Sequence, residues 1–428
     1  MRDDTRAWIE GDFRHCWHPF TRQADWCATG HHPVVIARAS GAWLVDSEGR
    51  QYLDGNSSIW TNIHGHGHPT LVAAVQKQAA TLSHASFLGY THPGAVELAT
   101  RLCGFFPEGT LERVFYSDDG STAIECALKM SLQFRQLNGQ PEKRAFIAFE
   151  NGYHGDTLGA ASLGGVSRFF DRFASLGHTV HHIRDLDELR NIPPHEIAGC
   201  VIEPVIQGVN QMHPWPPGML SDLRAWCDAC DVHLILDEVM TGFGRTGAMF
   251  ACQLESVTPD FLCLAKGLTG GMLPMAATLT TGRVYDAFLG AADRAFYYGH
   301  SYTANPLGCA AALASLEIFA TESVLESLPE KSAAIATGLA ALKARHPMIH
   351  EIRQVGMIAG IELRRPDGVA FPVAERLGER ICLAARKHGL LTRPILDTIV
   401  FMPPLCVTGD EISHAVSALD AAICESGH

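Results

Sequence analysis

The sequence lacks the features that define several large classes of protein. It has no cluster of lysine and arginine, and its formal net charge is -13 over 428 residues. This charge balance argues against a nucleic-acid partner, because binding to phosphates needs clustered cations. No uncharged apolar run is long enough to cross a membrane, and the start, MRDDTRAWIEGDF, has no apolar signal-peptide core. We therefore expect a cytoplasmic protein with no membrane partner.

The thirteen cysteines have no regular spacing, and their number is odd. A secreted disulfide framework would be small and evenly paired, so we expect reduced thiols. The single C-x-x-C pair, Cys227 and Cys230, has no second pair that could complete a zinc site. Single glycines separate His64, His66 and His68, which is not a zinc spacing either. The sequence therefore predicts no metal.

Short apolar runs alternate with amphipathic segments through most of the chain, without internal repeats or long linkers. Two segments, 121–136 and 218–230, have the apolar spacing of helices. Five runs are β-branched or aromatic and apolar on both faces, as buried parallel strands are: 113–117, 144–150, 198–205, 232–239 and 260–265. This alternation predicts an α/β fold with a mainly parallel central sheet.

The two ends of the chain differ from its middle. Residues 41–55 predict a β-hairpin with a polar turn at 47–49. After Pro306, a long helical stretch is followed by strand-like runs at 356–364 and 398–404. We predict a large domain over residues 61–305 and a small α+β domain built from residues 1–60 and 306–428.

One lysine, Lys266, lies between an apolar run and a glycine-rich loop in LAKGLTGGMLP, residues 264–274. Burying an ammonium without a partner is costly, so a surface lysine at a strand end is the simplest interpretation. The alternative is an amine held in a closed pocket to form a Schiff base. Residues at the ends of the other predicted strands can distinguish the two interpretations.

A carboxylate, Asp237, lies near the carboxyl end of the run at 232–239. In open α/β sheets, the side chains that bind ligands lie at the carboxyl ends of strands. Asp237 is two residues from Val239 and therefore shares a face with it. An Asp on a buried strand needs a cationic or donor partner. Arg245 is the structural candidate, and a protonated ring nitrogen of a ligand is the functional one.

Gly120 and Ser121 begin a predicted helix directly after a strand, where free N–H groups bind phosphate well. An ordinary capped helix start, with Asp119 or Ser121 as the cap, is the alternative. After another strand, Tyr153 in ENGYHGDT offers an aromatic ring, although the segment also fits a polar turn. A lysine, a carboxylate, a phosphate cradle and an aromatic ring together match one ligand, pyridoxal 5'-phosphate.

The motifs LDEVMTGFGRTG, LAKGLTGGMLP, NGYHGDT and GHSYTANPLGCA closely resemble those of the class III pyridoxal-phosphate aminotransferases of fold type I. The resemblance covers nearly the whole chain. Three more segments, HCWHPFT, LDGNSSIWTNIHGHGHP and LLTRPILDTIVFMPP, resemble one branch of that family. This branch aminates 8-amino-7-oxononanoate to 7,8-diaminononanoate in biotin synthesis.

The resemblance implies a role for each cofactor-site residue. Lys266 would form the Schiff base and carry the proton between substrate and cofactor carbons. Asp237 would pair with the pyridine nitrogen, and Tyr153 and Val239 would cover the two ring faces. The remaining cofactor-binding residues would be Gly120, Ser121, His300 and Ser301. Ser301 would act on the neighbouring subunit's phosphate, so the family resemblance implies a homodimer with shared sites.

The resemblance also implies substrate contacts. Arg393 would bind the carboxylate of the keto acid, and Gly299 would line the substrate channel. Tyr153 and Trp60 would contact substrate, as would Phe20 and Ile59. Enzymes that use S-adenosylmethionine as donor have tyrosine and tryptophan at these last two positions, and a branch that uses lysine resembles this chain there. Either donor therefore remains open.

Three alternatives remain. GFGRTG, residues 242–247, fits the G-x-G-x-x-G pattern of dinucleotide-binding dehydrogenases, but no good helix follows it. A non-catalytic binding protein could retain the same fold, although the set of lysine, aspartate and tyrosine is intact. Within the family, ω-amino acid, ornithine-like and diamine aminotransferases that use pyruvate or 2-oxoglutarate are the alternatives.

Overall fold

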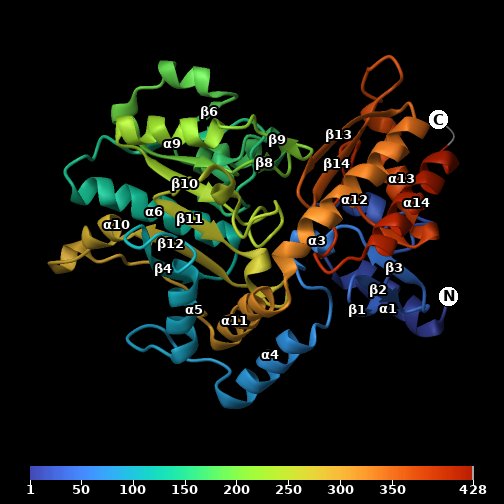
Figure 1. Cartoon of the computed structure of the whole chain (residues 1–428), viewed down its shortest axis with the longest axis horizontal. Coiled ribbons are helices and arrows are strands. Elements are labelled where there is room, and N and C mark those ends of the chain that lie inside the picture. Colours follow the sequence, from blue (N-terminus) through green and yellow to red (C-terminus); the bar gives the residue numbers. More distant parts are fainter. Residues whose placement is uncertain (427–428) are drawn as a thin grey trace.

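A seven-stranded sheet forms the centre of the larger of two lobes in the computed structural model, which describes residues 1–426 (Figure 1). Its strand order is β4-β12-β11-β10-β7-β5-β6. Strand β12 is antiparallel to both neighbours, and the other adjacent pairs are parallel. The strands are β4 (Leu111–Ser117), β5 (Ala145–Phe149), β6 (Val180–Ile183), β7 (Ile197–Ile202), β10 (His233–Asp237), β11 (Phe261–Leu264) and β12 (Ala276–Thr281). The predicted α/β fold with a mainly parallel sheet is confirmed.

Alternate residues of each central strand point to opposite layers of helices. In β5, Phe146 packs in the cluster that includes helix α6 (Gly120–Leu137). Its neighbour Ile147 packs in the cluster that includes α9 (Met219–Cys230) and α5 (Pro93–Cys103). Both faces of the sheet are therefore covered, which is why its strands are apolar throughout.

The predicted strand at 198–205 is shorter than expected, because β7 ends at Ile202. Pro204 has no N–H group to donate to a neighbouring strand, so the chain leaves the sheet before it. This early end leaves Glu203 at the carboxyl edge of the sheet. The chain then forms a short hairpin of β8 (Ile206–Gln207) and β9 (His213–Pro214).

The smaller lobe contains both ends of the described chain (Figure 1). One of its sheets has the order β1-β2-β3-β15, and the other has the order β13-β14-β17-β16. Their strands are β1 (Ile36–Ser40), β2 (Trp43–Asp46), β3 (Gln51–Asp54), β13 (Ile349–Val355), β14 (Ile358–Leu363), β15 (Leu390–Leu391), β16 (Pro394–Ile395) and β17 (Thr398–Phe401). The predicted hairpin at 41–55 is confirmed as β2 and β3. Because β15 pairs in parallel with β3, segments from the two ends of the chain share a sheet.

The helices of the smaller lobe include α1 (Asp3–His15), α12 (Val324–Arg345), α13 (Leu377–Ala385) and α14 (Gly409–Glu425). Two helices, α4 (Pro69–Thr81) and α11 (Pro306–Thr321), contact each other, and α11 also contacts α5. The proposed domain limits at residues 60 and 305 stay predictions. The remaining short helices used below are α2 (Gln23–Trp26), α3 (Ser57–Trp60), α7 (Leu158–Leu163), α8 (Ser167–Phe170) and α10 (Gly282–Asp286).

No single helix within residues 1–426 has the length and apolar character to cross a membrane. Helices α11 and α12 together meet the length and composition test, but they are bent by 75° at the break between them. Ten residues of α11 are buried, so its apolar surface belongs to the protein core.

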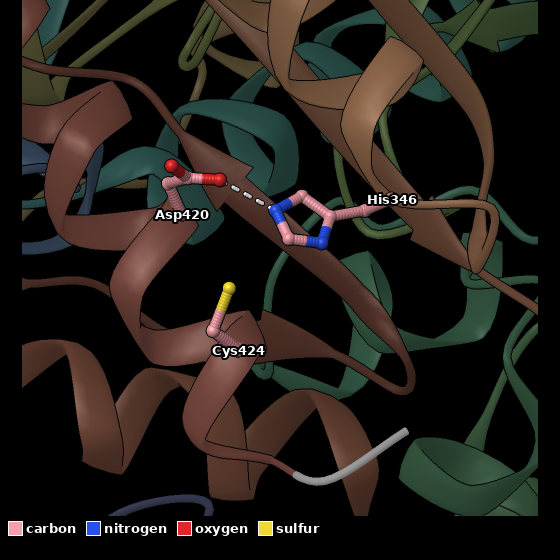
Figure 2. A group of neighbouring side chains, drawn as sticks. All are labelled: His346, Asp420 and Cys424. Carbon is pink, nitrogen blue, oxygen red and sulfur yellow. Dashed lines mark hydrogen bonds and ion pairs between the residues drawn. The ribbon is translucent and has the colours of Figure 1, made fainter.

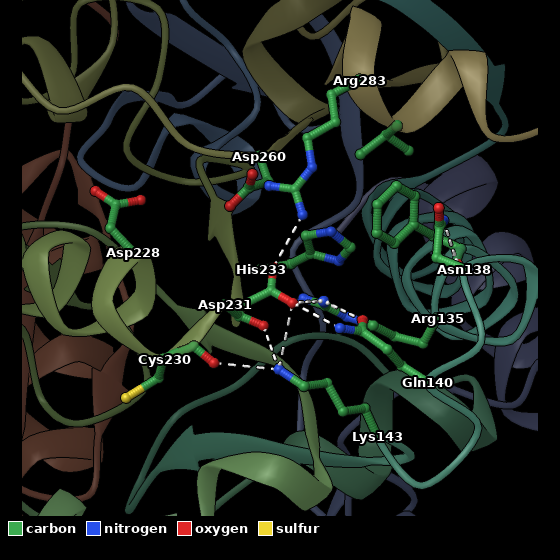
Figure 3. Close-up of polar contacts among 12 residues, drawn as sticks. Arg135, Asn138, Gln140, Lys143, Asp228, Cys230, Asp231, His233, Asp260 and Arg283 are labelled. Carbon is green, nitrogen blue, oxygen red and sulfur yellow. Dashed lines mark hydrogen bonds and ion pairs between the residues drawn. The ribbon is translucent and has the colours of Figure 1, made fainter.

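A polar cluster closes the amino-terminal edge of the central sheet (Figure 3). Arg135, fully buried at the end of α6, donates to Asp231 Oδ2 over 2.9 Å. Arg283 donates to the other oxygen of Asp231, and Lys143 donates to the carbonyl of Cys230. This cluster joins α6, α9 and α10 below the strands, so the opposite, carboxyl edge is the one left open.

Candidate active site

The loops after five strands of the large sheet face one cavity of about 420 Å³. This is the carboxyl edge, where ligands bind in open α/β sheets. The volume lies within the range of small-molecule sites. Seven residues that the sequence assigned to cofactor or substrate line the cavity: Trp60, Gly120, Ser121, Tyr153, Asp237, Val239 and Lys266.

Lys266 follows β11 and begins a short 3-10 turn that ends at Thr269. Its backbone has φ 45, a left-handed conformation that is uncommon for a residue with a side chain. Within the described residues its amine has no hydrogen-bond partner, and Nζ lies 4.9 Å from the centroid of the Trp60 ring. Burial lowers the pKa of Lys266, while the charges of Asp237 and Glu203 oppose that shift. An amine with a lowered pKa is a better nucleophile near neutral pH.

Asp237, the last residue of β10, is buried against a histidine rather than an arginine. Its Oδ2 atom lies 2.8 Å from Nδ1 of His154, and its Oδ1 atom accepts the Val239 N–H over 3.1 Å. Burial lowers the pKa of His154, but the hydrogen bond and charge of Asp237 outweigh this and raise it. The structural partner considered for Asp237 was wrong: Arg245 instead donates to the carbonyls of Pro403 and Asn62.

Glu203 is a second buried carboxyl group in the cavity wall. Its two oxygens accept the N–H groups of Tyr153, over 3.0 Å, and Gly208, over 2.8 Å. Burial raises the pKa of Glu203 to about 7, although the charge of His154 and the two N–H groups oppose the shift. The carboxyl group therefore connects the loop after β5 to the hairpin after β7.

The first turn of α6 leaves N–H groups free at the cavity. Asp119 caps this helix, with its side chain accepting the Thr122 N–H and the Thr122 hydroxyl facing back in a capping box. The N–H groups of Gly120 and Ser121 have no acceptor within residues 1–426, and both residues line the cavity. The end of an 18-residue helix with unpaired N–H groups suits an anion.

Two glycines keep this cradle open. A Cβ atom on Gly120 would lie 2.7 Å from Cγ1 of Val239, and one on Gly155 would lie 2.0 Å from Oγ of Ser121. Gly155 also has φ 121, which residues with side chains rarely adopt. No larger residue fits at either position without moving the cavity wall.

Tyr153 and Val239 both border the cavity. The Tyr153 hydroxyl donates to Asp156 over 2.6 Å, which fixes the ring at the wall. The structure thus brings together the lysine, carboxylate, aromatic ring and anion cradle that the sequence placed on separate loops.

Six of the predicted residues do not line this cavity. Phe20 and Ile59 are 57% and 43% exposed, and Phe20 packs edge-on against Phe169. Nδ1 of His300 lies 3.0 Å from Asp118, which does line the cavity. The other three, Gly299, Ser301 and Arg393, are exposed.

Sequence reasoning missed two groups in the site. His154 could not be found, because nothing local in the sequence shows that it meets a residue 83 positions away. Glu203 could have been found, since it is an acidic residue at the carboxyl end of an apolar run, as Asp237 is.

One group of possible metal ligands lies far from the cavity, between α12 and α14 (Figure 2). It consists of His346, Asp420 and Cys424, whose ligand atoms lie within 4.8 Å of one another. His346 already bonds to Asp420 Oδ1 over 2.5 Å, and Arg345 Nε lies 3.2 Å from the same oxygen. These two partners account for the carboxylate, so we assign it no metal. The three histidines at 64–68 each bond to a protein side chain.

Known proteins resemble this chain over its whole length. A protein of Geobacter sulfurreducens named adenosylmethionine-8-amino-7-oxononanoate aminotransferase is 43% identical, over 98% of each chain. The crystal structure of the protein of that name from Methanocaldococcus jannaschii superposes with a TM-score of 0.95 at 37% identity, covering 99% of both chains. An amine transaminase from an uncultivated Pseudomonas species, in a PLP-bound form, has a TM-score of 0.90 at 32% identity, covering 96% of this chain and 98% of the other.

Residues 26–423 match the family described as "Aminotransferase class-III". The match takes in every residue that lines the cavity, from Trp60 to Met275. With an unpaired lysine and a buried aspartate in that cavity, sequence, fold and site agree. The chain belongs to the class III aminotransferase family and is an aminotransferase.

Proposed function

We propose that this enzyme transfers an amino group to 8-amino-7-oxononanoate, forming 7,8-diaminononanoate for biotin synthesis, with pyridoxal 5'-phosphate as cofactor. The observation that carries the proposal is the meeting of Lys266, Asp237 and the start of α6 in one cavity. Relatives that bear the name of this activity and match the chain end to end support the choice of acceptor.

The cavity fits the cofactor in three ways. The unpaired Lys266 amine can condense with its aldehyde, and the buried Asp237 carboxylate can face its ring nitrogen. The free N–H groups of Gly120 and Ser121 can hold its phosphate, in a space that a Cβ atom on Gly120 would fill. Tyr153 and Val239 would then border the two faces of the ring.

When bound, the cofactor supplies an aldehyde that condenses with amines and a ring that withdraws electrons. The residues of this chain supply orientation and proton transfer. His154 and the Val239 N–H hold Asp237 in place, so that its carboxylate can keep a proton on the ring nitrogen. Lys266 Nζ would take the proton from the substrate carbon that bears the amine and deliver it to the carbon that the cofactor contributes as its aldehyde. Donor and acceptor react in turn in the same cavity.

The unpaired Arg393 supports a carboxylate-bearing acceptor. Its guanidinium has no hydrogen bond or ion pair to any residue of 1–426 and is exposed, so it is available to a ligand. The donor is S-adenosylmethionine or lysine. Phe20 and Ile59 support lysine, because they present apolar surface where a phenol and an indole would otherwise stand.

A homodimer with shared sites is the second part of this proposal. Ser301 is exposed and does not line the cavity of its own chain. Large apolar residues are exposed on two nearby segments: Leu88, Tyr90, Tyr297 and Tyr302. The ring centroids of His84 and Tyr302 lie 4.7 Å apart, and this contact joins the two segments into one surface. A second copy covering this surface would bring Ser301 to the partner's phosphate. Light scattering after gel filtration tests this, and a monomer would contradict it.

All thirteen cysteines are free in the structure, which supports a reducing compartment such as the cytoplasm. No disulfide is needed to hold either lobe.

The test is a donor panel with purified enzyme, the cofactor and 8-amino-7-oxononanoate. We expect mass spectrometry to detect 7,8-diaminononanoate with S-adenosylmethionine or lysine, and Lys266→Ala to abolish it. Borohydride reduction should leave pyridoxyl mass on the peptide that contains Lys266. A panel in which only pyruvate or 2-oxoglutarate accepts the amine would instead favour an ω-amino acid or diamine aminotransferase, which the likeness to an amine transaminase supports.

A further inference from the structure

The segment Ser57–Trp60 has an unusual backbone. Three of its four residues, Ser57, Ser58 and Trp60, have φ values of 47, 62 and 64. Residues with side chains rarely adopt this left-handed conformation, and three in one short segment persist only if the surroundings hold them. The segment presents Ile59 to the outside and Trp60 to the cavity.

A buried carboxylate, Asp54, holds this segment. It is the last residue of β3, and both of its oxygens lie within 3.0 Å of the Ser58 N–H, at 2.9 and 2.7 Å. Oδ1 also accepts the Asn56 N–H over 3.3 Å, and Oδ2 lies 2.9 Å from Nε2 of His66. The carboxylate thus accepts from Ser58 inside the strained segment and from Asn56 directly before it.

The same segment fixes the Trp60 ring. The indole Nε1 donates to the Asn56 side chain over 3.0 Å, and the Ser57 hydroxyl donates to the Met402 carbonyl over 2.7 Å. Asp54 therefore connects to the ring through the backbone of Asn56 and Ser58. Within residues 1–426, this ring is the aromatic surface over the Lys266 amine, 4.9 Å from its centroid.

We propose that Asp54 is a positioning residue that holds Trp60 against the Lys266 nitrogen. An indole face stabilises a nearby cation, so Trp60 favours the protonated form of that nitrogen. Asparagine at position 54 would keep the size but replace one acceptor oxygen with a donor. The Ser58 N–H would keep only one of its two acceptor oxygens, and either the Asn56 N–H or His66 would lose its bond to residue 54. We expect the left-handed residues then to relax and the indole to move from Lys266. This inference rests on the proposed function, because it takes the cavity as the site of amine transfer.

The charged groups that face the Lys266 nitrogen are Asp237, Glu203 and Arg245. None of them bonds to Asp54, but the charge of Asp54 acts on Arg245 and opposes the lowering of its pKa by burial. A background that lacks the indole therefore separates the route through Trp60 from a route through Arg245. The test compares wild type, Asp54→Asn, Trp60→Ala and the double variant, each loaded with pyridoxal 5'-phosphate. The visible absorbance of each is titrated with pH, and the rate of the half-reaction with amino donor alone is measured.

We expect Asp54→Asn to shift the pH midpoint of the visible absorbance to a lower value. It should also slow the half-reaction with amino donor about 10- to 100-fold, as misplacement of groups in an active site does. In the Trp60→Ala background the same substitution should change either quantity less than about twofold, because coupled residues are not additive. Effects of Asp54→Asn that persist in full in that background would overturn the proposal. Asn56→Ala, which removes the indole's acceptor, should reproduce the titration shift, and its failure to do so would also overturn it.

Asp46→Asn is the matched control. Asp46 is equally buried at the end of the neighbouring strand β2, and accepts the N–H groups of Glu48 and Arg50 and the hydroxyl of Tyr52. Asp46→Asn should lower the melting temperature without changing the pH midpoint of the visible absorbance. If Asp54→Asn behaves like this control, the proposal is wrong. The pH titration of the visible absorbance needs no amino acceptor. If the proposed acceptor were wrong, the titration would still behave as expected, but no 7,8-diaminononanoate would form. The two failures can therefore be told apart.

Discussion

Nδ1 of His154 lies 2.8 Å from Oδ2 of Asp237, and both side chains are buried. The Val239 N–H bonds to the other oxygen of the carboxylate, so Asp237 is held from two sides. The carboxylate proposed to face the cofactor ring is therefore already oriented before a ligand enters the cavity. Such preorganisation avoids the cost of arranging charges during the reaction.

Replacing His154 should weaken cofactor binding. His154→Phe leaves Asp237 buried without its charged donor, a loss of about 1.5–3 kcal/mol, or about 10- to 100-fold in affinity. His154→Gln keeps a donor and should lose less. Equilibrium dialysis of pyridoxal 5'-phosphate measures both, and equal affinities for the two variants would contradict the role of the hydrogen bond.

The stability of the cofactor-free enzyme should fall with rising pH through Glu203. Its folded pKa is raised to about 7 from 4.5, so the folded protein keeps a proton that the unfolded chain has released. The contribution of Glu203 is fully present below pH 4.5 and is lost as pH rises towards about 7. Melting temperatures of wild type and Glu203→Gln, measured between about pH 5 and pH 8, should therefore differ in slope. Parallel curves would contradict this assignment.

Gly155→Ala should weaken cofactor binding in addition to lowering stability. Its Cβ atom would lie 2.0 Å from the Ser121 hydroxyl, at the proposed phosphate cradle. Gly247→Ala is the control, because Gly247 has φ 103 but nothing within 4 Å of its Cβ position. Both variants should lose about 1–3 kcal/mol of stability through backbone strain. Only Gly155→Ala should raise the cofactor dissociation constant, by about tenfold or more.

Arg393→Met should raise KM for the keto-acid acceptor by about 10- to 100-fold, which is the value of a charged hydrogen bond. Because the guanidinium has no partner among residues 1–426, the melting temperature should not change. Arg38→Met, at another exposed and unpaired arginine on β1, is the control. An unchanged acceptor KM in Arg393→Met would assign the carboxylate to another cation.

Most of the central sheet could be predicted, because its buried parallel strands are apolar on both faces. Strand β12 was not predicted, since three of its six residues are threonines, which are polar in a sequence pattern. In the structure Thr278 and Thr280 satisfy their hydroxyls by donating to the carbonyls of Ala123 and Asp260. A hydroxyl paired in this way is tolerated in a core, and the partner is invisible in the sequence.

The candidate site could be predicted group by group, but not contact by contact. Lys266, Asp237 and Gly120 were found because each follows an apolar run, and the fold brings such ends together. The pairing of Asp237 was wrong because Arg245 is closer in sequence than His154. Only the register of β5 beside β7, and β7 beside β10, brings the histidine next to the aspartate.

The parallel pairing of β15 with β3 has a consequence for biosynthesis. Leu53 and Asp54 meet Leu390 and Leu391 only after nearly the whole polypeptide has left the ribosome. Until then the sheet of β1, β2 and β3 lacks β15, and Asp54, the carboxylate proposed to hold Trp60, lies on an unpaired edge strand. The larger lobe can fold during translation, whereas the Trp60 indole reaches its place only at the end. A nascent chain would therefore form the proposed phosphate site before the aromatic surface beside Lys266.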